Sequence, residues 1–238
     1  MAVGDVRQKT FQSGGKTHAF KFATAADQGG VEELHASWWS FDDEQEVRDR
    51  HWHVRPGETV LDVGAAFGSY ALPALAMGAR VVAFSPAEYD TRLLRANLAL
   101  NPELAARCLV VRDGLHERDG WFDPDHSIFA ASRPVDTDQH ETGQWLRVRS
   151  LDSWLAERPG IGRVDYVKMD VEGAELGVLR GAREMLQRDW PRLLIECHSF
   201  HVPDMWQRIN DYFHEIGAPY VGVNHPHCAV SHAYFERG

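Results

Sequence analysis

The sequence lacks long apolar runs and is poor in cysteine and in positive charge. No stretch approaches the ~20 apolar residues of a membrane-spanning helix, and residues 1–20 contain no signal-peptide core. The three cysteines form no CxxC pair, which argues against a disulfide framework or a cysteine-rich zinc site. A formal net charge of −10 disfavours nucleic acid and anionic membranes as partners. We therefore expect a cytoplasmic protein with no nucleic-acid or membrane partner.

What the chain does contain is the composition of an ordinary globular domain. It has 238 residues, of which 44% are apolar and 25% are charged. This length is sufficient for one sizeable α/β domain with a full hydrophobic core.

Strand and helix patterns alternate from residue 56 onward. Strands are predicted at 59–63, 79–84, 108–111, 164–169 and 191–197, and an antiparallel pair at 220–223 and 229–235. Helices are predicted at 69–77, 90–101, 150–157, 173–187 and 203–217. Near-continuous apolar strands separated by helices indicate a parallel sheet covered on both faces. The pattern predicts an α/β fold with a mostly parallel, seven-stranded sheet.

Two segments depart from this alternation. Residues 1–55 are predicted to form a small N-terminal cap or lid on the domain at 56–238, with a hairpin over 10–22 and a short helix from about Asp42. The lid would use Trp38, Trp39, Glu44 and Glu46. The second segment, 119–146, shows little periodicity, and long loops of this kind diversify function. We expect it to bind the acceptor substrate.

A glycine-rich turn, VLDVGAAFGSY, follows the first strand of the domain. Gly64 and Gly68 let the backbone approach a ligand, and the next helix presents N–H groups to it. The dinucleotide motif has an additional glycine that makes room for a pyrophosphate, whereas Ala65 and Ala66 fill that room here. A nucleoside without phosphates fits better, and S-adenosylmethionine (SAM) is the candidate. The predicted contacts are Asp62, Gly64, Ala65, Phe67, Gly68 and Ser69.

The second strand ends in VVAFSPAEYD, where nucleoside-binding folds usually carry an acidic residue for the ribose. Ser85 occupies this place, and Pro86 holds it extended. A serine should weaken donor binding about tenfold relative to a carboxylate. Glu88 is a candidate replacement that could reach back to the ribose. Asp113 and Gly114 follow the third strand, where a carboxylate can accept a hydrogen bond from an exocyclic amine, and they are predicted to contact the adenine.

The fourth and fifth strands carry the most specific pattern, VDYVKMDVEGAELGVLRGAREML followed by PRLLIECH. Together with VLDVGAAFG, this pattern resembles the FkbM family of SAM-dependent methyltransferases over residues 55–200. Its K-x-D-x-E-G-x-E segment is matched by Lys168, Asp170, Glu172, Gly173 and Glu175. The resemblance implies a Rossmann-like class I methyltransferase fold and methyl transfer to a hydroxyl of a natural product or sugar. Ser85 departs from the family, which typically has Glu there.

The acceptor hydroxyl must lose its proton during transfer, so a base or a metal ion would help. Our leading hypothesis makes His198 the general base, with Asp170 and Glu172 orienting the substrate or donor. Under this hypothesis no metal is bound. An alternative, not favoured, joins Asp170, Glu196 and His198 into a divalent-cation site.

Other polar residues near these strands receive simpler interpretations. A buried ion pair with Glu172 or Glu196 is expected for Lys168, because a lone buried lysine is costly. Glu175 is expected either to begin a solvated helix face or to support the turn. The histidines of the tail are interpreted as surface residues: His225, His227 and His232.

The sequence thus predicts a SAM-dependent O-methyltransferase acting on a small-molecule acceptor, and a homodimer is possible. Two alternatives stay open. A degenerate methyltransferase fold could serve as a binding or structural protein, which Ser85 supports. A nicotinamide-dependent oxidoreductase is less favoured, because the chain lacks the third glycine and a Tyr-x-x-x-Lys proton donor.

Overall fold

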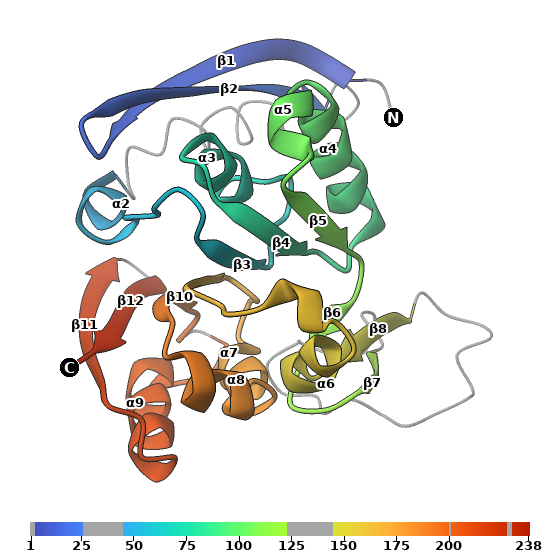
Figure 1. Cartoon of the computed structure of the whole chain (residues 1–238). Helices are drawn as coiled ribbons and strands as arrows, with labels where there is room; N and C mark the ends of the chain where they lie inside the picture. Colours follow the sequence, from blue (N-terminus) through green and yellow to red (C-terminus); the bar gives the residue numbers. More distant parts are fainter. Residues whose placement is uncertain (1–2, 26–44, 123–144, 200, 228–229) are drawn as a thin grey trace. The chain divides into compact units, whose positions relative to one another are not determined.

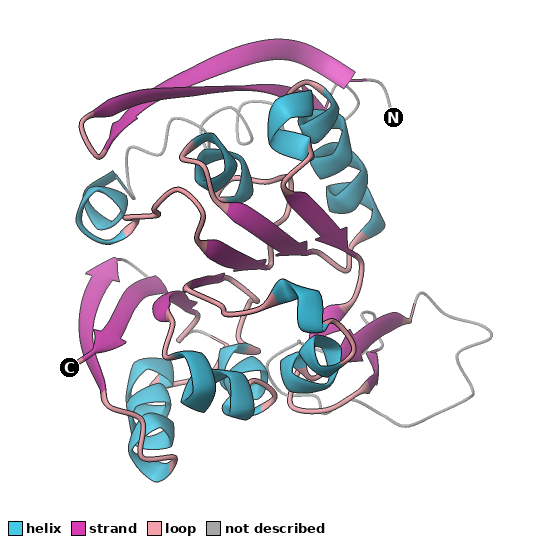
Figure 2. Ribbon diagram, viewed as in Figure 1, coloured by secondary structure: helices cyan, strands magenta, loops and turns pink. Residues whose placement is uncertain are grey.

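The computed structural model describes residues 3–25, 45–122, 145–199, 201–227 and 230–238 (Figure 1). These residues fall into two compact units, 1–111 and 112–238. Helices and strands alternate in both units after the N-terminal hairpin (Figure 2). Trp38, Trp39, Glu44 and most of the predicted acceptor-binding segment lie outside the described residues.

The first unit contains a parallel sheet in the order β3-β4-β5, preceded by a β-hairpin. Its elements are β1 (Val3–Ser13), β2 (Lys16–Ala25), α2 (Gln45–His51), β3 (Thr59–Val63), α3 (Ala71–Ala76), β4 (Arg80–Phe84), α4 (Glu88–Ala99), α5 (Pro102–Ala105) and β5 (Cys108–Val111). All five residues of β3 are buried, as expected for a strand inside a parallel sheet. The predicted strands 59–63 and 108–111 are confirmed at both ends.

Two buried asparagines attach the hairpin to the helices of this unit. The Asn97 carboxamide accepts a hydrogen bond from the Ala23 amide (2.7 Å) and donates to the Phe67 carbonyl (3.0 Å). The Asn101 carboxamide accepts a hydrogen bond from the Lys21 amide (2.7 Å) and donates one to the Lys21 carbonyl (2.6 Å). The hairpin consequently lies over α3 and α4 (Figure 1). Because Phe67 belongs to the glycine-rich turn, Asn97 links that turn to the hairpin.

The second unit contains the sheet order β11-β12-β10-β9, in which β9 and β10 are parallel and the last two strands antiparallel. The elements around this sheet are α6 (Leu151–Ala156), η2 (Pro159–Ile161), β9 (Tyr166–Met169), α7 (Glu175–Arg180), α8 (Arg183–Asp189), β10 (Arg192–Cys197), α9 (Met205–Glu215), β11 (Tyr220–His227) and β12 (Val230–Arg237). A smaller sheet has the order β6-β8-β7, from Gly114–Leu115, Leu146–Arg149 and Gly120–Phe122.

The strands β3, β4, β5, β9, β10, β11 and β12 are the seven strands, mostly parallel, of a Rossmann-like α/β fold, as predicted. The predicted N-cap Ser150 is also confirmed, since its hydroxyl accepts from the Ser153 amide. Among the described residues, no helix has the length and apolar character that crossing a membrane requires.

Two expectations about secondary structure were wrong. The predicted helix over 173–187 is two helices, α7 and α8, divided at Gly181. A Cβ atom at Gly181 would collide with the His116 carbonyl oxygen, and the Asp152 carboxylate caps α8 by accepting from the Glu184 and Met185 amides. The segment 119–146 is also not wholly loop, because Gly120–Phe122 pairs with β8 as strand β7.

Candidate active site

The glycine-rich turn in unit 1 needs glycine at both predicted positions. Gly64 has a φ of 83° and donates to the Phe84 carbonyl (3.0 Å), which ties the turn to β4. Gly68 has a φ of 101°, and a Cβ there would lie 2.7 Å from Leu94 Cδ1. Both backbone conformations are strained for any residue with a side chain. The spacing seen in the sequence is therefore a requirement of the turn itself.

The other predicted donor contacts in this turn are mostly buried. Asp62, Ala65 and Phe67 are 2%, 1% and 1% exposed, whereas Ser69 is half-buried. The Asp62 carboxylate adds to the effect of burial in raising the pKa of the Cys108 thiol to about 12. A ligand at this turn would consequently meet backbone groups more readily than the Ala65 and Phe67 side chains. Their direct role in donor binding stays a prediction.

Ser85 lies at the end of β4 and is buried, with its backbone fully engaged. Its amide donates to the Val111 carbonyl (3.0 Å), and its carbonyl accepts from the Thr91 hydroxyl (2.8 Å). Pro86 follows in the connection to α4, and Glu88 begins that helix. The Glu88 carboxylate is exposed and pairs with Arg92 at 3.0 Å. Such a surface pair is worth roughly 0–1 kcal/mol, so Glu88 is not fixed there.

The predicted adenine contacts belong to unit 2. Asp113 is mostly buried, with its carboxylate 3.9 Å from the Arg147 guanidinium, and Gly114 begins strand β6. Arg147 thus gives Asp113 a partner within the protein. The contact of Asp113 with the adenine of SAM stays a prediction.

The predicted catalytic residues do come together in unit 2. Asp170 and Glu172 follow β9, and Glu196 and His198 lie at the end of the neighbouring parallel strand β10. His198 Nε2 lies 3.7 Å from Asp170 Oδ1, 3.4 Å from Glu172 Oε2 and 3.8 Å from Glu196 Oε1. The His198 side chain is 3% exposed, so these carboxylates surround a buried imidazole edge. His201, also on this side, lies 3.6 Å from Glu172.

The other edge of the His198 ring contacts Glu175. The distance between His198 Nδ1 and Glu175 Oε1 is 2.7 Å, and the same oxygen accepts from the Gly173 amide (2.9 Å). Glu175 is fully buried, so its interpretation as a solvated helix residue was wrong, and its support of the turn is confirmed. A carboxylate at this distance accepts from Nδ1–H, and Nε2 then faces Glu172, Asp170 and Glu196.

Glu196 has different surroundings at its two oxygens. Oε2 lies 3.5 Å from Lys168 Nζ and 3.7 Å from His232 Nε2, whereas Oε1 faces His198. The expected buried ion pair of Lys168 is thus confirmed, with Glu196 as its partner. His232 was expected on the surface but is 4% exposed, because it is the cross-strand neighbour of Glu196 between β10 and β12.

The charges of this cluster shift the pKa values of its members in opposite directions. Burial, together with Glu196 and Glu172, raises the pKa of Asp170 to about 7 against the effects of Lys168 and His198. The pKa of His198 is raised: burial lowers it, but the hydrogen bond and charge of Glu175, together with the charges of Asp170 and Glu172, outweigh burial. The pKa of Glu196 is lowered, because Lys168 and two histidines outweigh its burial. Protonation within the cluster is therefore shared among neighbours.

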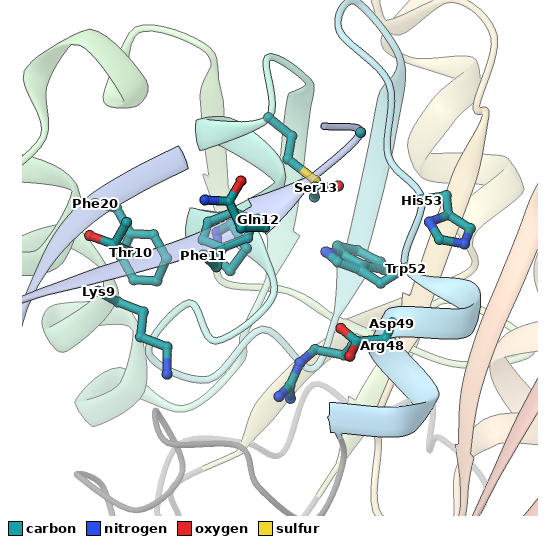
Figure 3. A pocket seen from close by; sticks show the side chains of 13 residues that line it. Lys9, Thr10, Phe11, Gln12, Ser13, Phe20, Arg48, Asp49, Trp52 and His53 are labelled. Carbon is teal, nitrogen blue, oxygen red and sulfur yellow. The ribbon is translucent and has the colours of Figure 1, made fainter. Parts of the chain in front are cut away.

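Unit 1 also contains a pocket of about 540 Å³ that none of the predicted site residues line. Its walls come from the hairpin, α2 and α3, and include Phe11, Trp52, Lys9 and Arg48 (Figure 3). The pocket adjoins Pro73 and Met77 on α3, whereas the glycine-rich turn precedes that helix.

Comparison with solved structures supports the fold. The crystal structure of methyltransferase FkbM from Methylobacillus flagellatus KT matches 88% of this chain and 55% of its own, with 22% identity and a TM-score of 0.58. The Thermus thermophilus 16S rRNA methyltransferase RsmC, solved with AdoMet and guanosine, matches 98% of this chain and 51% of its own, with 15% identity and a TM-score of 0.51. The fold is that of the class I methyltransferases.

The family follows from the sequence comparison. The methyltransferase FkbM domain matches residues 62–220, and the chain belongs to this family. The chain is 32% identical over 171 residues to 31-O-demethyl-FK506 methyltransferase FkbM of Streptomyces tacrolimicus, covering 59% of this chain and 64% of that protein. It is 28% identical over 181 residues to the AMB antimetabolite synthetase AmbE of Pseudomonas aeruginosa, covering 60% of this chain and 8% of that protein. The chain thus spans less than two thirds of these relatives.

Proposed function

We propose that the chain transfers the methyl group of SAM to a hydroxyl oxygen of a small molecule, a natural product or a sugar. Membership of a methyltransferase family supports the reaction class. The name of the Streptomyces relative, a 31-O-demethyl-FK506 methyltransferase, supports oxygen as the acceptor atom. The observation that carries the proposal is the contact between Glu175 and His198 Nδ1.

Methyl transfer from a sulfonium is an in-line displacement, in which the C–S bond breaks as the new O–C bond forms. The donor is already activated, so the protein mainly aligns the two reactants. An alcohol is a poor nucleophile while it keeps its proton. A buried imidazole backed by a carboxylate, with further carboxylates at Asp170 and Glu172, is suited to hold the hydroxyl and assist loss of that proton.

Separate sets of residues are proposed to bind the two reactants. Residues of the glycine-rich turn and the end of β4 in unit 1 are proposed to bind the donor, with Asp113 and Gly114 as adenine contacts. The cluster at β9 and β10 is proposed to serve the acceptor. A polar cluster with four carboxylates and one lysine favours an acceptor without negative charge.

Calorimetric titration tests the donor and separates the alternatives. We expect SAM to bind and NAD⁺ not to bind, and we expect the methyl group of labelled SAM to appear as a methyl ether on a hydroxylated acceptor. Absence of SAM binding at millimolar ligand would contradict the proposal. SAM binding without transfer to any of a broad panel of hydroxylated acceptors would instead favour a binding protein with a methyltransferase fold.

A further inference from the structure

We propose that Asp170, Glu196 and His198 bind one divalent cation of the Mg²⁺ or Mn²⁺ type, which in turn binds the acceptor hydroxyl. One ligand atom from each residue lies within 4.8 Å of the other two. The catalytic role of the cation rests on the proposed function, but its binding does not. The cation supplies what a hydroxyl acceptor lacks, a positive charge to stabilise the alkoxide that attacks the methyl group.

The spacing of the ligand atoms suits a cation at their centre. His198 Nε2 is 3.7 Å from Asp170 Oδ1 and 3.8 Å from Glu196 Oε1, longer than hydrogen bonds between these groups. Metal–ligand bonds of roughly 2.0–2.2 Å place adjacent ligand atoms about 3.0–3.6 Å apart. All three ligand atoms lie within 4.8 Å of one another, so closing them around a metal ion takes changes of at most roughly 1–2 Å in the distances between them.

Residues outside the ligand set already orient it. Glu175 holds His198 Nδ1 at 2.7 Å, which leaves Nε2 as the nitrogen that faces Asp170 and Glu196. A metal-binding histidine almost always donates its other ring N–H to a carboxylate, a backbone carbonyl or a water, and Glu175 is such a carboxylate. Lys168 and His232 lie beside Oε2 of Glu196, which leaves Oε1 on the side of His198. The contacts of Glu175, Lys168 and His232 thus leave Nε2 of His198 and Oε1 of Glu196 as the atoms that face the proposed cation.

The charge balance of the cluster also favours a cation. Asp170, Glu172, Glu175 and Glu196 are within one cluster, and Lys168 is the residue of fixed positive charge that pairs with it. Concentrated carboxylates at a buried histidine repel one another, and a divalent ion offsets that repulsion. Two carboxylate oxygens and one imidazole nitrogen leave coordination positions for the acceptor and for water.

The reaction then balances without a redox step. The hydroxyl bound to the cation releases its proton to the exposed carboxylate of Glu172 and from there to solvent. The resulting alkoxide forms the O–C bond, the C–S bond breaks, and the sulfonium becomes the neutral thioether of the leaving donor. In this arrangement His198 is a ligand of the cation and Glu172 replaces it as the proton acceptor, whereas Glu175 is a positioning residue.

Mn²⁺ titration of the whole chain tests the proposal without any substrate. After treatment with EDTA and its removal, electron paramagnetic resonance of free Mn²⁺ should show one bound ion per chain. Asp170→Asn and Glu196→Gln should each weaken this binding at least tenfold. Glu215→Gln, an exposed change on α9, is the matched control and should leave it unchanged.

Circular dichroism and thermal unfolding of each variant supply the folding control, because neither measurement depends on a donor, an acceptor or a cation. Absence of stoichiometric Mn²⁺ binding at millimolar ion would overturn the proposal, as would equal binding by wild type and both ligand variants. Full methyl transfer after EDTA treatment would overturn the catalytic role. Loss of SAM binding by the wild-type protein would contradict the proposed function, and Mn²⁺ binding would still be measurable.

Discussion

The glycine-rich turn of unit 1 and the polar cluster of unit 2 are built on opposite principles. The turn is a backbone structure: Gly64 and Gly68 adopt conformations that are strained for residues with a side chain, and its Phe67 side chain is buried. The cluster is a side-chain structure, in which Glu175, Glu196 and His198 are brought together from segments over twenty residues apart. We therefore expect changes in the cluster to alter chemistry, and changes in the turn to alter donor affinity and stability.

The sharpest test of this difference is His198→Asn. We expect methyl transfer to fall about 10²- to 10⁴-fold, the usual worth of a group that assists proton loss, with SAM affinity unchanged. Single-turnover rates and calorimetry of the same variant measure the two quantities. An equal loss of SAM affinity and rate would show that the two regions do not divide the work as proposed.

Glu175→Gln should have the next largest effect. Glutamine keeps the size of the side chain but weakens the hold on His198 Nδ1, and loss of such a second-layer carboxylate typically costs 10–100-fold in activity or metal affinity. The loss should appear in kcat and in Mn²⁺ binding, whereas Tm should change little. Glu184→Gln, an exposed change on the neighbouring helix α8, is the control. Retention of full kcat and full Mn²⁺ affinity by Glu175→Gln would remove the positioning role.

The turn should respond through stability instead. Gly68→Ala forces a side chain into a φ of 101° and against Leu94, which should cost about 1–3 kcal/mol of unfolding free energy and weaken SAM binding. Gly160→Ala is the matched control, because Gly160 has no positive φ and nothing within 4 Å of an added Cβ. Denaturant unfolding compares the two variants, and equal stabilities would contradict the strained geometry.

Asn97→Ala extends the same reasoning to the hairpin. It leaves the Ala23 amide and the Phe67 carbonyl without their buried partner, each worth about 1–3 kcal/mol when unsatisfied. We expect lower stability and a modest loss of SAM affinity, because Phe67 belongs to the turn. Unchanged SAM affinity in the destabilised protein would show that the hairpin does not support the donor site.

The two regions also differ in how well the sequence predicts them. The turn is local, so the spacing of Gly64 and Gly68 was sufficient to place it after β3. The cluster depends on strand register: Asp170 and His198 could be assigned to neighbouring strand ends, but the place of His232 beside Glu196 follows from the β10–β12 pairing. The burial of Glu175 was missed because an acidic residue in a first helical turn is usually solvated. Its partner His198 lies 23 positions away.

The smallest expected effects concern the end of β4, where Ser85 replaces the usual carboxylate. Ser85→Glu should tighten SAM binding about tenfold, because a charged hydrogen bond to a hydroxyl exceeds a neutral one by roughly 1–1.5 kcal/mol. Glu88→Ala should weaken SAM binding several-fold if Glu88 exchanges its Arg92 pair for the ribose, and Arg92→Ala separates this from loss of the pair itself. Calorimetry measures all three. Ser85 is 2% exposed, so a glutamate there must point out of the sheet edge to be tolerated. Unchanged SAM affinity in both Ser85→Glu and Glu88→Ala would show that the ribose does not bind at this strand end.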